Sequence, residues 1–150
     1  MSSIKRHISI QPISREHHSA LLFCWHIKQG ILKNVSAERM SNYALWFFET
    51  QIERHFEFEE KFMLPILIYE NDLVNRTIKE HAILKELFKS TNEIGLINLA
   101  KKLQEHIRFE ERLLFNEIEK VASHEQLQII LENSMNNSEC PVWQDTFWKE

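Results

Sequence analysis

The chain has few of the residues that interrupt helices or cross-link a fold: two Gly, three Pro and two Cys in 150 residues. A β-rich domain of this size normally needs more turn residues, so the composition predicts an all-α fold. The length fits one domain, residues 1–150. Cys24 and Cys140 have no cysteine nearby, so we expect two reduced thiols rather than a disulfide framework.

Other absences exclude whole classes of function. No apolar run is long enough to cross a membrane, and the opening MSSIKRHISIQPIS is too polar for a secretory signal, so we expect a cytoplasmic protein. Lys and Arg are scattered and the net charge is −4, which predicts no nucleic-acid partner. The chain has no phosphate loop, dinucleotide fingerprint or nucleophile–base pair. Any enzymatic activity would therefore come from a bound metal, as oxidase or peroxidase chemistry.

Hydrophobic periodicity predicts four long helices and a shorter fifth one. Their expected ranges are about 15–33, 36–64, 73–90, 96–121 and 123–135, after an extended lead-in over 1–13. The boundary residues are the caps Ser14, Ser36 and Asn71–Asp72, the terminator Pro65, and the capping box Ser123 with Gln126. Short connections between long amphipathic helices predict an up-down-up-down four-helix bundle over about 14–121. A C-terminal helix and an aromatic tail would occupy 122–150.

Two acidic stretches repeat the same pattern about fifty residues apart. ERHFEFEEKFML carries His55 and Glu59, and EHIRFEERLLF carries His106 and Glu110. Residues four apart lie one turn apart on the same helix face, and the neighbours on that face are apolar. A carboxylate placed there must be paired, hydrogen-bonded or bound to a metal, because an isolated buried charge is very costly. One HxxxE is a weak signal, whereas two copies in matching settings indicate an internal duplication.

The other two long helices each carry a Glu-His pair, Glu16-His17 and Glu80-His81. Inward groups from four antiparallel helices would converge on the axis. On the first helix, His17 lies near the centre of the apolar arc and His18 at its edge, so we favour His17 and keep His18 as the alternative. Four imidazoles and two carboxylates suit iron, manganese or zinc, and two bridging carboxylates would make a dinuclear site. The predicted ligands are His17 (or His18), His55, Glu59, His81, His106 and Glu110.

Several neighbours of these residues are expected to have ordinary surface roles. The glutamates beside the key carboxylates should lie on solvated faces, and the remaining histidines should lie at the surface or in the lead-in. These residues are Glu57, Glu60, Glu111, His7, His26 and His124.

At these motifs the chain resembles the hemerythrin-like (HHE cation-binding) family. The segments ISREHHSALLFCWHIKQG, HFEFEEKFMLP, EHAILKEL and HIRFEERLLF resemble the four helices of that family in order, over roughly residues 10–120. The resemblance implies a four-helix bundle with a non-haem di-iron centre that binds or reacts with dioxygen or nitric oxide. It assigns the four histidines as terminal ligands and Glu59 and Glu110 as bridges.

The chain departs from the oxygen-carrying members of that family at one histidine. Those members have a second His one turn after the first on the third helix, where this chain has Lys85. Their final carboxylate would also correspond to Glu111. The pattern is more similar to the branch that includes iron-centre repair proteins and the iron-sensing domain of an F-box protein.

Three functions follow as hypotheses. The first is gas binding by a di-iron centre, for sensing, storage or detoxification. The second is iron handling or iron-centre repair. The third is a metal-free helical interaction module, in which the Trp143–Trp148 tail contacts a partner or a second copy. That tail can also fold back onto the helices.

Overall fold

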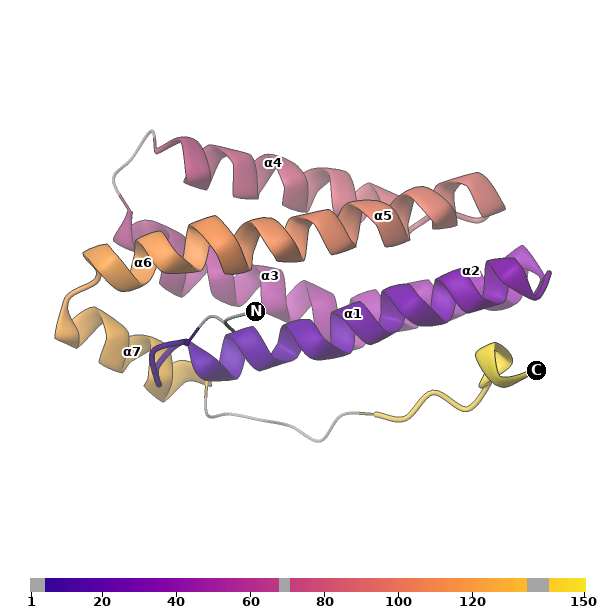
Figure 1. Ribbon diagram of the computed structural model, residues 1–150, viewed down its shortest axis with the longest axis horizontal. Coiled ribbons are helices and arrows are strands. Elements are labelled where there is room, and N and C mark those ends of the chain that lie inside the picture. The colour runs from indigo at the N-terminus through magenta and orange to yellow at the C-terminus, as the bar shows by residue number, and fades with distance from the viewer. Residues whose placement is uncertain (1–4, 68–70, 135–140) are drawn as a thin grey trace.

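The computed structural model describes residues 5–67, 71–134 and 141–150, and in these residues it is helical without any strand (Figure 1). The long runs are α1 (Gln11–Leu32), a second run through α2 (Ala37–Phe47) and α3 (Glu53–Phe58), α4 (Asp72–Leu87), and a fourth run through α5 (Glu93–Phe109) and α6 (Phe115–Val121). A further helix, α7, spans His124–Ser134. Short 3-10 turns span Leu64–Ile66 and Phe147–Lys149.

Most helix boundaries lie where local sequence signals predict them. Ser36 accepts a hydrogen bond from the Arg39 amide, and Asn71 accepts one from Leu73. In the capping box, the Gln126 side chain accepts from the Ser123 amide and the Ser123 hydroxyl accepts from the Gln126 amide. These contacts satisfy amide groups that a helix start leaves without partners.

The predicted start of the first helix is wrong. α1 begins at Gln11 with Pro12 in its first turn, a position where the missing amide of proline is tolerated. Ser14 does not cap the helix; its hydroxyl donates to the carboxylate of Glu111 instead. The end of the predicted lead-in is therefore part of the packed structure, and Ile10 is fully buried.

Three π-helical turns interrupt the long runs, at Phe48–Ile52, Glu59–Met63 and Glu110–Leu114. In two of them the carbonyl of a predicted bridging glutamate accepts a hydrogen bond five residues on, from Leu64 and from Phe115. The wider turn shifts the helix face by about one residue, and such turns are frequent at functional sites. A regular helix would place Leu113 on the same face as Glu110, but Leu113 is 49% exposed, while Leu114 and Phe115 are buried.

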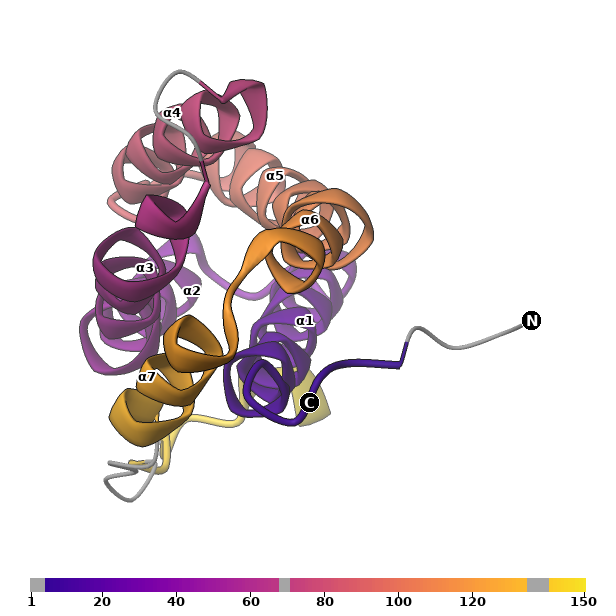
Figure 2. The same cartoon turned by 90° about the vertical axis from the view of Figure 1, so that its left-hand side faces the viewer.

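The long runs lie around a common axis when the molecule is viewed end-on (Figure 2). α5 packs against both α1 and α4, and α7 contacts α1. In the part of the chain that the structure describes, buried apolar residues form two clusters, and α1 carries Ile13 in one and Ala20 in the other, with His17 between them. The two apolar clusters therefore meet at the level of the predicted site.

The C-terminal residues 141–150 fold back along α1 and α2 (Figure 1). Phe147 is fully buried, and the Arg39 guanidinium pairs with the carboxylates of Asp145 and Glu150. The expectation that His26 lies at the surface is wrong. Its ring is buried and stacks on Trp148, with 3.6 Å between the ring centres. Among the described residues, no helix is both long and apolar enough to cross a membrane.

Candidate metal centre

All six residues predicted as ligands come together in the interior. Their side chains form two groups of four potential ligands, each with its ligand atoms within 4.8 Å of one another. One group contains His17 and His55, the other contains His81 and His106, and both share Glu59 and Glu110. His18 is exposed, so the structure places His17 in the site and His18 outside it.

Each shared carboxylate faces one imidazole from its own helical run and one from another run. Glu59 lies 3.2 Å from Nε2 of His55 and 3.0 Å from Nε2 of His81. Glu110 lies 3.1 Å from Nε2 of His106 and 2.9 Å from Nε2 of His17. The two halves of the site therefore repeat the internal duplication of the sequence, with both carboxylates 0% exposed.

Four buried polar atoms at this centre lie in ion-pair contact but make no hydrogen bond of acceptable geometry among the described residues. They are Nε2 of His55, Nε2 of His106, Oε2 of Glu59 and Oε2 of Glu110. A buried polar atom without a partner is costly, and such atoms are rare in native proteins. Two imidazole nitrogens and two carboxylate oxygens directed at one another form a donor set that fits transition-metal cations.

Each imidazole also has a second carboxylate on its outer nitrogen. Nδ1 of His17 lies 2.6 Å from Glu111, and Nδ1 of His55 lies 3.1 Å from Glu16. Nδ1 of His81 lies 2.7 Å from Glu60, and Nδ1 of His106 lies 2.7 Å from Glu80. We call Glu16, Glu60, Glu80 and Glu111 the outer carboxylates.

Each outer carboxylate is placed to accept a proton from Nδ1 of its histidine, so that loss of the Nε2 proton to an incoming cation would leave the Nε2 lone pair directed at the centre. Partners of this kind orient metal-binding histidines and increase their basicity. Glu60 is 39% exposed, as expected, but Glu111 is only 23% exposed, so the expectation of a solvated face is wrong for Glu111. Both contact a site histidine, because adjacent residues point about 100° apart on a helix and the second Glu of each doublet faces the neighbouring run.

The outer carboxylates follow one another around the site. Glu16 of α1 contacts the site histidine of the second run, and Glu60 of that run contacts the site histidine of α4. Glu80 of α4 contacts the site histidine of α5, and Glu111 contacts the site histidine of α1, which closes the ring. The doublets Glu16-His17, Glu59-Glu60, Glu80-His81 and Glu110-Glu111 are the sequence signal for this closed arrangement. Each helical run thus supplies both an inner ligand group and the support for a neighbour's histidine.

The carboxylates raise the pKa values of the site histidines. Burial by itself would lower the pKa of His81, but Glu110 and Glu59 raise it to about 9. Burial opposes the same change at His106, where Glu110 and Glu80 raise the pKa to about 10. Burial would raise the pKa of Glu110, yet His106 and His17 hold it well below its usual range. Protons and cations therefore compete for the same imidazoles.

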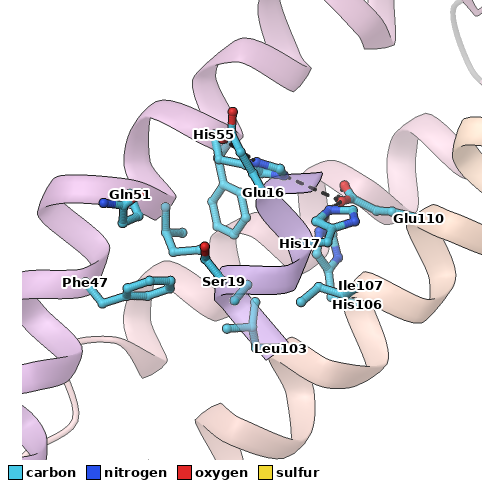
Figure 3. Close-up of a pocket in the computed structure, with 13 residues that line it drawn as sticks. Glu16, His17, Ser19, Phe47, Gln51, His55, Leu103, His106, Ile107 and Glu110 are labelled. Atoms are coloured by element: carbon cyan, nitrogen blue, oxygen red, sulfur yellow. Dashed lines mark hydrogen bonds and ion pairs between the residues drawn. The ribbon is translucent and has the colours of Figure 1, made fainter. Parts of the chain in front are cut away.

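A cavity of about 10 Å³ opens beside Glu110 (Figure 3). His55, His17 and His106 turn toward Glu110 at one end, and Phe47 and Leu103 lie at the other. This volume is about the smallest that holds one water-sized molecule. The arrangement therefore combines a compact donor set with room for one very small ligand.

Comparison with protein-family models, with curated proteins and with solved structures gave no match to this chain. The resemblance to the hemerythrin-like family therefore stays a prediction from the sequence motifs.

Proposed function

We propose that this protein binds two iron ions between Glu59 and Glu110 and that the centre binds or reacts with dioxygen or nitric oxide. Manganese and zinc are the alternative occupants. The observation that carries the proposal is the set of four buried polar atoms that make no hydrogen bond and converge where the two four-residue groups meet. Two cations placed there would satisfy those atoms and balance two fully buried carboxylates.

The residues divide this task between them. His17 and His55 would hold one ion, His81 and His106 the other, and the two glutamates would contact both. Bound iron would supply affinity for diatomic gases and redox chemistry. The outer carboxylates hold the imidazole orientation, and the surrounding apolar clusters exclude bulk water.

The small cavity supports a diatomic ligand. Each four-residue group provides four protein ligands, and iron commonly takes more, so positions for a gas or water would remain open. The cavity reaches His55, His106 and Glu110 and has space for only one water-sized molecule. A larger organic substrate would not fit without movement of the helices.

The helix arrangement supports the same proposal. The long runs alternate in direction along the long axis (Figure 1) and surround one axis in the end-on view (Figure 2). We infer from these views an up-down-up-down four-helix bundle, the architecture that the hemerythrin-like resemblance implies, in which metal ligands project inward from facing helices.

A second candidate is iron handling or repair of iron centres. In the resemblance to the hemerythrin-like family, Lys85 corresponds to a further histidine ligand of the oxygen-carrying members, and each four-residue group contains only two imidazoles. Fewer nitrogen ligands favour weaker binding and release of iron. Transfer of iron from the loaded protein to a metal-free acceptor distinguishes this function from a permanent centre.

The test is elemental analysis of anaerobically purified protein, with optical spectra of the reduced and oxidised forms. We expect about two iron ions per chain and near-ultraviolet charge-transfer bands after oxidation. Glu59→Ala and Glu110→Ala should lose the metal, whereas Glu57→Ala, which removes an exposed glutamate of the same helix, should retain it. Purified protein with stoichiometric zinc alone, or with no metal at all, would contradict the proposal.

A further inference from the structure

A second polar and aromatic cluster lies away from the candidate metal centre, around Tyr43 of α2 and His26 of α1. The Tyr43 ring centre is 5.9 Å from Trp46, 5.8 Å from Trp143 and 5.2 Å from Trp148. The remaining tryptophan, Trp25, lies 5.7 Å from His26. All four tryptophans of the chain therefore surround this one tyrosine–histidine pair.

Tyr43 and His26 share a short, buried hydrogen bond. The distance between the Tyr43 hydroxyl oxygen and Nδ1 of His26 is 2.7 Å. Burial, together with the nearby Lys149 charge, lowers the pKa of His26 to about 4, so the ring is neutral near pH 7. In the tautomer that carries its proton on Nε2, Nδ1 accepts the hydrogen bond from the phenol. Burial also raises the pKa of the Tyr43 phenol, which therefore stays protonated.

Aromatic rings connect this pair to the cavity of the candidate centre. Tyr43 lies 5.1 Å from Phe23, and Phe23 stacks on Phe47 at 4.6 Å. Phe47 in turn lines the cavity that His55 and Glu110 also line (Figure 3). On the other side of Tyr43, Trp143 and Trp148 are only partly buried. The rings thus run from the cavity to the surface.

We infer that Tyr43 and His26 form a redox-active pair. The Tyr43 phenol gives one electron to a strong one-electron oxidant, which is reduced by that electron, while the phenol proton moves from the oxygen to Nδ1 of His26. The products are a neutral phenoxyl radical and an imidazolium. The indole of Trp148 or Trp143 then gives an electron to the phenoxyl radical, and the proton moves back from His26 to the phenol oxygen. A soluble thiol reduces the indole radical cation by one electron and becomes a thiyl radical with loss of its proton, and two thiyl radicals combine to a disulfide.

This pair protects the buried histidines from oxidative damage by drawing oxidising equivalents outward along the rings. The oxidant would be a peroxide-derived equivalent at the candidate centre, so its source rests on the proposed function. The chemistry of the pair itself does not. A neutral imidazole held on the phenol proton lowers the barrier to oxidation, because the electron leaves without creating a buried protonated radical cation.

The test uses the full chain with redox-inert zinc added, so that it does not depend on bound iron. A photogenerated ruthenium(III) polypyridyl complex, with persulfate as electron acceptor, serves as the oxidant. Electron paramagnetic resonance and transient absorption should show a neutral tyrosyl radical that forms more slowly in D₂O. Tyr43→Phe should abolish this signal, whereas Tyr69→Phe, which removes the other tyrosine, should retain it.

His26→Phe keeps an aromatic ring against Trp148 but removes the proton acceptor. The tyrosyl signal should be lost in this variant while tryptophanyl radicals still form, which shows that the oxidant has reacted. A tyrosyl signal that persists in Tyr43→Phe would overturn the inference. So would a wild-type signal without a solvent isotope effect, or oxidation confined to tryptophan. Because iron plays no part in these measurements, they fail or succeed independently of the proposed function.

Discussion

Replacing Glu110 by Gln is the most direct perturbation of the candidate centre, because it removes one buried charge and nearly preserves the shape. Glu110 is 0% exposed and lies 2.9 Å from His17 and 3.1 Å from His106. Removing one partner of a buried ion pair typically costs about 3–5 kcal/mol. Gln retains one carbonyl acceptor, so we expect the free energy of unfolding of the metal-free protein to fall by about 3 kcal/mol near pH 7.

The same substitution should remove most of the stability that metal contributes. A ligand that binds only the folded state stabilises it by about 2.7 kcal/mol when its free concentration is 100 times Kd. Glu110 belongs to both four-residue groups, so its loss weakens both positions. Wild-type protein should therefore gain stability on addition of ferrous iron, and the variant should gain little.

The assay is anaerobic urea unfolding followed by circular dichroism, with a chelator and then with excess ferrous iron. Glu105→Gln is the matched control, because Glu105 is an exposed glutamate of the same helix and should change both results by less than about 0.5 kcal/mol. An iron-dependent gain that survives in Glu110→Gln would refute the bridging role. A variant as stable as the wild type without metal would refute the ion-pair reasoning.

Three further predictions concern protons, one ligand choice and the tail. Metal affinity should rise with pH, because the proton that competes at His106 has a pKa of about 10 in the folded, metal-free protein against ~6.5 unfolded. The folding stability of the metal-free protein that comes from this raised pKa is fully present below ~6.5 and is lost as pH rises through about 10. Because fewer protons compete with the metal at higher pH, chelator competition should show tighter metal binding at about pH 9 than at about pH 7. His17→Ala should lose metal on elemental analysis, whereas His18→Ala should not. Of these two histidines, only His17 is buried and belongs to a ligand group. Phe147→Ala should cost about 3–5 kcal/mol in urea unfolding, and Val142→Ala, at 78% exposed, less than about 0.5 kcal/mol.

Local signals predicted most helix boundaries because the physics there is local. Ser36, Asn71 and the Ser123–Gln126 pair satisfy amides within three residues along the chain, so their sequence context is sufficient. Ser14 has the same residue type but a different partner, since Glu111 lies beside it in the fold. No sequence window around Ser14 contains that carboxylate, and the helix start was misplaced for this reason.

The π-helical turn after Glu110 explains why Leu113 faces outward, although regular periodicity places it on the inward face. Regular 3.6-residue periodicity places His106 and Glu110 on one face, and both are buried. Beyond Glu110 the hydrogen bond to the Phe115 amide spans five residues, so Leu113 turns outward. The widened turn begins at the carboxylate in both copies of the repeat, which ties this irregularity to the site rather than to the apolar pattern.

The inner ligands were predictable and the outer carboxylates were not, although both are encoded in the same short motifs. Periodicity identifies which residues share a face, and this selects His55 with Glu59. The next residue in the sequence points about 100° away, so its partner depends on which helical run packs beside it. Sequence periodicity does not contain that information about tertiary packing. Once the runs are placed, Glu60 must face α4 and Glu111 must face α1, and each meets an imidazole there. The acidic doublets thus serve two layers of one site, with the first residue directed at the centre and the second at a neighbouring histidine.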